Sequence, residues 1–301
     1  YLAHLIQYPG ILPKVALLFK SDEGVGKNIF FLKFAEYFLN LEYFLETQKI
    51  EQVVGKFNLI PKKLLICLDE VSGSSTFSKA DDIKSLITQE VINWEKKNCD
   101  AIQIQNCGRY IFFSNNDTPI KIGLTDRRFA CFNCNNEFAN DKNYFDELIG
   151  ELDNNDCMYS FYKFLKERDI REFNITDRPE TDYYKELKSV NIPVVAKFLQ
   201  YKLEFTKKNE IIFNSNDLYT DFKFYLQSYY RDIDITSCKF GRDIIKYDGI
   251  EKKRNKRQNI YIIHVKILLE YLKKKKYLEE LEYVDTEIPT NSIVIDYNDE
   301  I

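Results

Sequence analysis

The stretch from Val15 to Asn28 constrains the fold more than any other part of the sequence. It begins with an apolar run, residues 15–19, that has the length and composition of a strand buried on both faces. Residues 29–39 then place apolar side chains at helical spacing, with no proline or glycine among them. The loop between these segments is therefore predicted to join a buried strand to the N-terminus of a helix.

This loop has the composition of a phosphate-binding site. Backbone N–H groups that converge at a helix N-terminus bind anions, and the helix dipole adds partial positive charge. The segment Gly24, Val25 and Gly26 lets the backbone approach phosphates, and Lys27 can reach their β and γ oxygens. Asn28 offers an amide oxygen to Mg²⁺ where such loops have a hydroxyl. We predict a site for a nucleoside triphosphate and Mg²⁺; the alternative is an ordinary glycine turn.

Two further apolar segments end in polar side chains. Residues 63–68 lead into Asp69 and Glu70, and residues 109–113 lead towards Asn115. We expect the strand before Asp69 to lie beside the first strand, so that Asp69 holds Mg²⁺ and Glu70 polarises the attacking water. Asn115 would then bond the γ-phosphate or that water. The alternatives are a solvated strand end for the two acids and a turn-initiating role for the asparagine.

A pair of cations follows each of these two segments in the sequence. Residues 92–104 predict a hairpin with Lys96 and Lys97 near its tip, which either contacts a nucleic-acid strand or is a polar turn with solvated lysines. Arg127 and Arg128 precede an apolar strand at residues 129–132. They are either surface charges or, supplied by a neighbouring subunit, stabilisers of phosphoryl-transfer charge.

Composition limits the class of protein. With 301 residues, 45% hydrophobic and 30% charged, the chain is globular and forms one large or two modest domains. Its net charge of −4 excludes a wholly basic nucleic-acid protein, so local patches must carry any such binding. No apolar run approaches the roughly 20 residues of a membrane span and no leader is evident, so we expect an intracellular protein without a membrane partner.

Cysteine usage and the first residue add two expectations. Seven irregularly spaced cysteines indicate reduced thiols. Cys131 and Cys134 lie in a predicted strand, where positions three apart point to opposite faces, so we do not expect a zinc site. The chain begins at Tyr1 and its single methionine is Met158, which suggests a piece of a longer polypeptide.

Four motifs occur in one order over residues 2–135: G-V-G-K-N, L-L-I-C-L-D-E, Y-I-F-F-S-N-N and D-R-R-F. This ordered set resembles the superfamily 3 helicases of the AAA+ class. It is most similar to the helicase half of viral and phage primase-helicases, the poxvirus type among them. The resemblance implies an α/β fold, with an AAA+ P-loop NTPase core of mostly parallel sheet flanked by helices and a helical tail, over residues 1–206.

The resemblance also implies roles for the motif residues, with ATP and Mg²⁺ as cofactors. Ser21 replaces the first glycine of the usual loop, and Asn28 replaces its hydroxyl residue. These departures concern the rate of ATP hydrolysis more than the binding of the nucleotide. By position, Lys27 is similar to the phosphate-binding lysine of the family, Asp69 to its magnesium residue and Glu70 to its catalytic acid. Asn115 is similar to the sensor asparagine. Arg128 is similar to the arginine finger, with Arg127 as the next candidate, and Lys96 and Lys97 are similar to the DNA-binding loop of the central channel.

The C-terminal part predicts a second module. Two helical segments, residues 216–230 and 236–246, precede a basic turn and a strand at 259–265, as in a winged-helix domain, here residues 207–286. Residues 287–301 form an acidic tail. The turn either contacts DNA phosphates or is a solvated hairpin tip, and its cations are Lys252, Lys253, Arg254, Lys256 and Arg257.

Together these features predict an ATP-dependent replicative DNA helicase that translocates on single-stranded or forked DNA. The resemblance implies a homo-oligomeric, hexameric ring, a possible primase domain upstream, and a location in the cytoplasm or at a viral replication site. One alternative is an AAA+ module that binds nucleotide without hydrolysis and loads or tethers a replication protein on DNA. Another is a small-molecule phosphotransferase, which would leave the basic turn unexplained.

Overall fold

The computed structural model describes residues 1–72, 76–174, 176–204, 206, 208–230, 233–254 and 259–278. The chain divides between Ile192 and Pro193 into two compact units. This division precedes residue 206, where the sequence placed the first boundary, so the helix over residues 194–204 belongs to the second unit. The predicted acidic tail, 287–301, lies outside the described residues.

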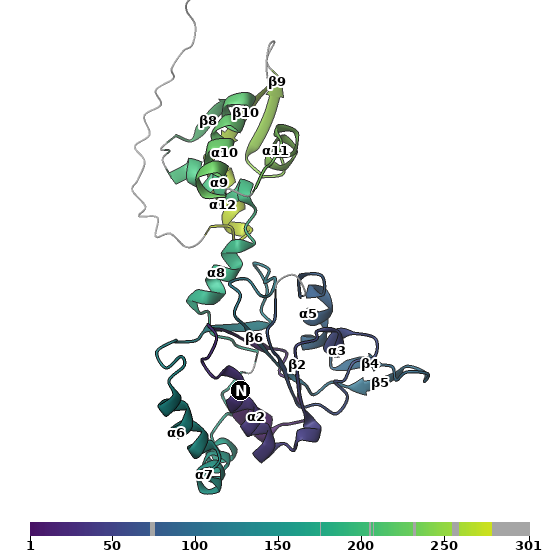
Figure 1. Cartoon of the computed structure of the whole chain (residues 1–301). Coiled ribbons are helices and arrows are strands. Elements are labelled where there is room, and N and C mark those ends of the chain that lie inside the picture. The colour runs from purple at the N-terminus through teal and green to yellow at the C-terminus, as the bar shows by residue number, and fades with distance from the viewer. Residues whose placement is uncertain are drawn as a thin grey trace, which may run out of the picture. The chain divides into compact units, whose positions relative to one another are not determined.

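The first unit is built on a five-stranded parallel sheet in the order β2–β3–β6–β1–β7 (Figure 1). The expectation that β3 lies beside β1 is wrong, because β6 lies between them. All six residues of β6 are buried, as a central strand requires. The strands are β1 (Ala16–Lys20), β2 (Phe44–Thr47), β3 (Leu65–Leu68), β6 (Arg109–Ser114) and β7 (Phe129–Asn133).

Helices cover both faces of this sheet (Figure 1). Along β3, Leu65 and Cys67 pack with α1, α2 and α7, whereas Ile66 and Leu68 pack with α3, α5 and α8. This burial on both faces explains why the strands read as apolar runs without alternation. The helices are α1 (Leu2–Gln7), α2 (Lys27–Phe38), the 3-10 turn η1 (Leu41–Tyr43), α3 (Glu51–Val54), α5 (Ala80–Thr88), α6 (Lys142–Leu152), α7 (Asn155–Glu167) and α8 (Asp182–Val190).

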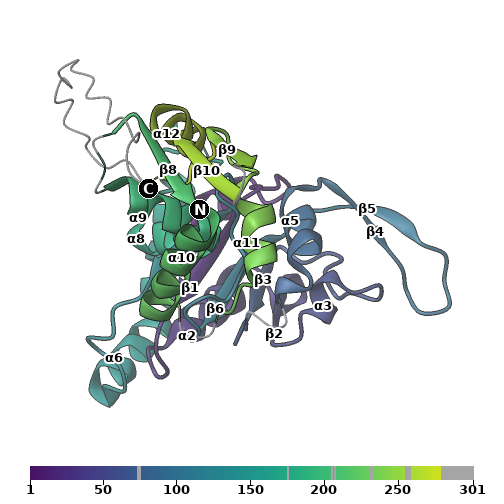
Figure 2. The same cartoon turned by 90° about the horizontal axis from the view of Figure 1, so that it is seen from above.

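A separate antiparallel hairpin extends away from the sheet, as Figure 2 shows. It consists of β4 (Val91–Trp94) and β5 (Ile102–Gln105), which confirms the predicted hairpin. Lys96 and Lys97 are exposed in the connection between the two strands.

The second unit has a three-stranded antiparallel sheet in the order β8–β10–β9. Its helices pack around an aromatic centre in which Phe222 stacks on Phe240 at 4.4 Å and meets Phe198 edge-on at 5.2 Å between ring centroids. The elements are α9 (Val194–Glu204), β8 (Glu210–Asn214), α10 (Ser215–Tyr229), α11 (Ser237–Ile244), β9 (Ile250–Arg254), β10 (Asn259–His264) and α12 (Val265–Lys274). The helices α10 and α11 confirm the two predicted helical segments.

Candidate nucleotide site

The loop between β1 and α2 depends on its two glycines. Gly24 and Gly26 have φ values of +79° and +71°, in the region that favours glycine. A Cβ would come within 2.2 Å of the Asn140 side chain at Gly24, and within 2.4 Å of the Phe145 ring at Gly26. Gly26 is also the N-cap of α2, so the capping position carries no side-chain oxygen to satisfy the first-turn N–H groups. An anion can therefore take the place of a capping side chain.

Lys27 and Asn115 meet beside this loop. The Lys27 ammonium group donates a hydrogen bond to the Asn115 side-chain oxygen. Asn115 directly follows β6, and β6 pairs with β1, which leads into the loop. The predicted phosphate-binding lysine and the predicted sensor amide therefore lie together, at the edge where the terminal phosphate of a bound nucleotide would be.

Asn28 lies among carboxylates. Its side-chain Nδ2 donates to Asp69 Oδ2 at 2.7 Å and to Glu46 Oε1 at 3.1 Å. Its Oδ1 is buried and has no hydrogen-bond partner among the residues that the structure describes. Glu46 lies on β2, beside β3. It was not predicted as a site residue, because no strand was expected at residues 44–47.

This oxygen set fits a magnesium ion. Burial and then the charge of Asp69 raise the pKa of Glu46, whereas the hydrogen bond from Asn28 lowers it. A divalent cation would relieve the repulsion between the two carboxylates. The Asn28 amide turns its Nδ2 towards them, so its unpartnered oxygen would become a ligand of this cation only with the amide flipped. Mg²⁺ is usually bound by one or two carboxylates with water and substrate phosphates, which agrees with this small set.

Glu70 lies at the same edge of the sheet, after β3. Its side chain is exposed, its φ is +52°, and its N–H donates to Asp69 Oδ1 at 2.9 Å. A left-handed conformation is costly for a residue other than glycine and is enriched at functional sites. The structure thus places the predicted catalytic acid next to the predicted magnesium residue, in the loop that follows β3.

The two predicted arginines lie at the other end of the sheet. Arg128 immediately precedes β7, which runs parallel to β1 with Ala16 opposite Phe129. The phosphate loop follows the C-terminal end of β1, about 16 Å further along a strand of this length. Arg128 therefore does not complete the nucleotide site of its own chain. Its predicted role, in the site of an adjacent copy, stays a prediction.

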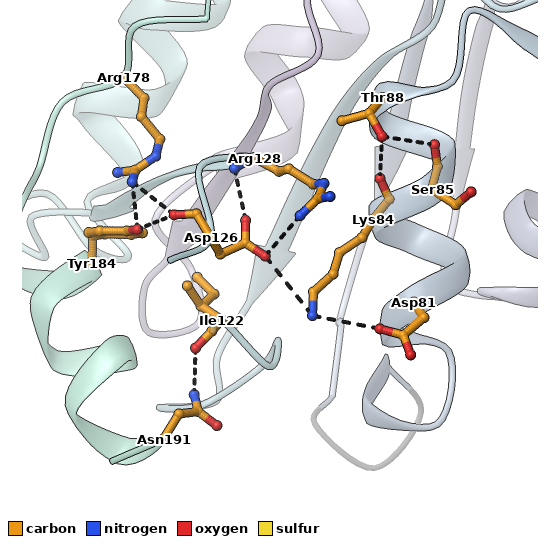
Figure 3. A network of polar contacts seen from close by, with 10 residues as sticks. All are labelled: Asp81, Lys84, Ser85, Thr88, Ile122, Asp126, Arg128, Arg178, Tyr184 and Asn191. Carbon is orange, nitrogen blue, oxygen red and sulfur yellow. Dashed lines mark hydrogen bonds and ion pairs between the residues drawn. The ribbon is translucent and has the colours of Figure 1, made fainter. Parts of the chain in front are cut away.

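Asp126 fixes the loop that carries Arg128 (Figure 3). Its buried carboxylate accepts from the Arg128 N–H at 2.8 Å and lies 3.5 Å from Arg128 Nη1 and 4.0 Å from Lys84 Nζ of α5. Its backbone oxygen accepts from Arg178 Nη2 at 2.9 Å and from the Tyr184 hydroxyl of α8. The Arg128 loop is thus connected to helices on both sides, while Arg127 is exposed.

The predicted DNA-binding cations belong to both units. Lys96 and Lys97 are exposed on the hairpin of the first unit. Lys252, Lys253 and Arg254 are exposed on β9 of the second unit, where Lys253 pairs with Glu251 at 3.2 Å. Lys256 and Arg257 lie outside the described residues.

Comparisons with known proteins point to phage proteins. Residues 19–128, which hold most of the motifs above, match the model of a family described only as a family of unknown function (DUF5906). A protein named DNA Primase-polymerase, from Nitratiruptor phage NrS-1, is 28% identical over 169 residues. The match covers 55% of this chain and 23% of that protein, so this chain spans less than a quarter of its relative's length.

Solved structures establish the fold. The apo C-terminal region of NrS-1 matches with a TM-score of 0.66 at 20% identity, over 87% of this chain and 69% of that chain. Its A form matches with a TM-score of 0.67 at 22% identity, over the same shares. The predicted α/β fold, with a mostly parallel sheet flanked by helices, is confirmed. The finer resemblance to superfamily 3 helicases stays a prediction.

Within the ranges described above, no helix combines the length and the apolar character that crossing a bilayer requires.

Proposed function

We propose that this chain is an ATP-binding motor of phage-type DNA replication, an AAA+ helicase core followed by a winged-helix-like module. It would bind ATP and Mg²⁺ at the loop between β1 and α2 and use hydrolysis to move along single-stranded or forked DNA. The observation that carries the proposal is the convergence of Lys27 with Asn115, and of Asn28 with Asp69 and Glu46, at one edge of the sheet. Similarity to a phage primase-polymerase supports the replication context and an intracellular site of action.

The residues of this edge divide the work of phosphoryl transfer. On binding, the phosphates would take the Lys27 ammonium group from Asn115, which then bonds the γ-phosphate or the attacking water. Mg²⁺, which neutralises phosphate charge, would be held by Asp69, and by the Asn28 oxygen once the amide is flipped to face the ion. Glu70, exposed beside them, would orient the water.

The positive charge that stabilises the γ-phosphate in the transition state would come from another copy of the chain. Arg128 lies at the far end of β1 from the phosphate loop, so it would serve the site of the next copy in a closed ring, with Arg127 as the second candidate. The exposed hairpin lysines and the β9 cations would hold DNA phosphates. Loss of the γ-phosphate after hydrolysis would then change the position of the hairpin along the bound DNA strand.

The test is ATP hydrolysis measured with and without single-stranded DNA. We expect DNA to stimulate the parental protein. Lys27→Ala should abolish hydrolysis, because it removes the group that binds the phosphates. Glu70→Gln should bind ATP normally but not turn it over.

The matched control is Lys163→Ala, an exposed lysine of the first unit on α7, to which no role is assigned. Parental rates in both the Lys27 and the Glu70 variants would show that this site assignment is wrong.

A second candidate function is an AAA+ module that binds nucleotide without hydrolysis and tethers a replication protein on DNA. Two observations favour it. Asn28 stands in place of a hydroxyl residue, and its amide is already bonded to both carboxylates. ATP binding without turnover under any DNA condition would select this function over the motor.

A further inference from the structure

The segment that follows β7 lies against the phosphate loop. The Cys134 N–H donates to the Lys20 oxygen at 2.7 Å, and the Asn140 N–H donates to the Gly24 oxygen at 3.1 Å. Between them, the Asn136 amide bonds the Asp22 carboxylate. Cys134, Asn136 and Asn140 are therefore attached in turn to successive residues from the end of β1 into the loop.

The start of α6 completes this contact. The Phe145 ring lies so close to Gly26, and the Asn140 side chain so close to Gly24, that neither glycine has room for a Cβ. The helix itself is anchored by Asp141, whose carboxylate caps the N–H of Tyr144. The first turn of α6 is thus held in place against the phosphate loop.

Two aromatic rings of this segment form an exposed pair. Phe138 and Tyr144 stack with their centroids 4.2 Å apart and their planes 10° from parallel. Tyr144 in turn meets Phe145 edge-on at 5.3 Å. Although stacked, the two rings belong to residues that remain 44% and 38% exposed. A flat aromatic surface therefore lies two ring contacts away from the glycine that starts the phosphate-binding helix.

We propose that Phe138 and Tyr144 are the platform on which the base of the bound nucleotide stacks. The inference deepens the proposed function, because it depends on a triphosphate bound at Gly24 to Lys27. The base and phosphates of one nucleotide are covalently joined, so a base must lie near the loop, and the described segment offers it a preformed aromatic face there. Stacking of a base on such a ring strengthens binding about 5- to 100-fold.

The chemistry of this platform predicts its selectivity. A ring face recognises the π-surface that all bases share and not their hydrogen-bonding edges. The platform should therefore favour nucleotides over a bare triphosphate, but discriminate weakly between adenine and guanine.

The experiment compares two ligands on the full chain: ATP, and inorganic tripolyphosphate, which has phosphates but no base. We expect Phe138→Ala and Tyr144→Ala to weaken ATP binding about 5- to 100-fold while tripolyphosphate affinity stays at the parental value. Phe138→Tyr should retain ATP binding, because it keeps a ring. Phe57→Ala is the matched control, since Phe57 is an exposed phenylalanine of the first unit in a different segment.

The outcomes separate the two proposals. If the parental protein binds neither ligand, the nucleotide site itself is refuted and the platform with it. If it binds both but the two alanine variants match the parent, only the platform is refuted. Equal loss of both ligands would overturn it as well, because the rings would then support the loop and not the base. The platform would also be overturned if the alanine variants changed oligomeric state but kept the parental preference for ATP over tripolyphosphate. The ring pair would then be a contact between copies of the chain.

Discussion

Arg109 is a charged side chain buried where the sequence suggested only the start of an apolar strand. Its residue exposure is 0%, and burial lowers its pKa to about 10, so it stays charged at neutral pH. Its Nη2 lies 3.1 Å from His4 Nδ1. The guanidinium group also donates to the backbone oxygens of Tyr8, Pro9, Ile11 and Cys107. This single residue therefore fixes the segment after α1 to the start of β6.

The same contact makes the stability of the first unit depend on pH. Burial, and next the charge of Arg109, lower the pKa of His4 to about 4. An unfolded chain protonates this histidine near pH 6.5, so the unfolded state gains a proton that the folded state excludes, and stability falls as the pH drops from 6.5 towards 4. We expect His4 to contribute a loss of about 1.6 kcal/mol between pH 6.5 and 5.

Chemical denaturation of His4→Gln at several pH values checks this prediction. The variant should lose less stability on acidification than the parent, whatever its stability at pH 7. His264, the other of the two histidines, lies in the second unit beside the carboxylates of Glu210 and Glu251, at 3.3 and 3.4 Å, so it is kept unchanged in both proteins. Identical acid slopes for His4→Gln and the parent would contradict the assignment.

At the scale of elements, α5 and α8 hold the short loop before β7. Asp126 is the point of attachment, through its carboxylate to Lys84 and through its backbone oxygen to Tyr184. If Arg128 acts on the nucleotide of an adjacent copy, Tyr184 is a positioning residue for it. We expect Tyr184→Phe to leave the affinity for ATP unchanged and to lower the turnover number roughly tenfold, because a small displacement of a catalytic group is costly.

A matched hydrogen bond gives the control for this prediction. The Tyr219 hydroxyl donates to the Ile235 backbone oxygen at 2.9 Å in the second unit, so Tyr219→Phe removes a similar bond far from Arg128 in the sequence. Both variants should lose about 1 kcal/mol of stability, but only Tyr184→Phe should lose turnover. Equal turnover in the two variants would reduce Tyr184 to a structural role.

The sequence predicted those elements whose signal is local. The strands β1, β3, β6 and β7 were evident because each is a short apolar run buried on both faces. The strand β2, F-L-E-T, was missed because it has two apolar residues and is defined by its pairing with β3. Glu46 was missed with it. The order of the strands was also wrong in one place, since pairing between distant segments leaves no local pattern.

The candidate site was predictable to the same extent. Lys27, Asp69 and Asn115 stand at strand ends or a helix start, and such positions are visible in the sequence. The contacts of the loop with Asn140 and Phe145 were not, because they depend on how α6 packs after β7. The Asp126 network was hidden for the same reason, since Lys84 and Tyr184 lie on separate helices and Arg178 lies in the segment before α8.

At the scale of the whole molecule, Lys27 and Arg128 lie at opposite ends of β1, so one copy cannot supply both to one nucleotide. We predict that Lys27→Ala and Arg128→Ala are each inactive alone but recover hydrolysis when mixed. In a ring assembled at random from equal amounts, about a quarter of the interfaces pair an intact Lys27 site with an intact Arg128. The mixture should therefore reach roughly a quarter of the parental ATPase rate.

A second mixture controls for this result. Lys27→Ala combined with the double variant Lys27→Ala, Arg128→Ala has no intact Lys27 site at any interface, so it should stay inactive however the copies assemble. Recovery in the first mixture but not in the second can arise only where two copies share one site. Light scattering shows whether the two variants assemble together. If they do, but the ATPase rate of the first mixture stays at that of its inactive components, the shared site is refuted and Arg128 is only a structural partner of Asp126.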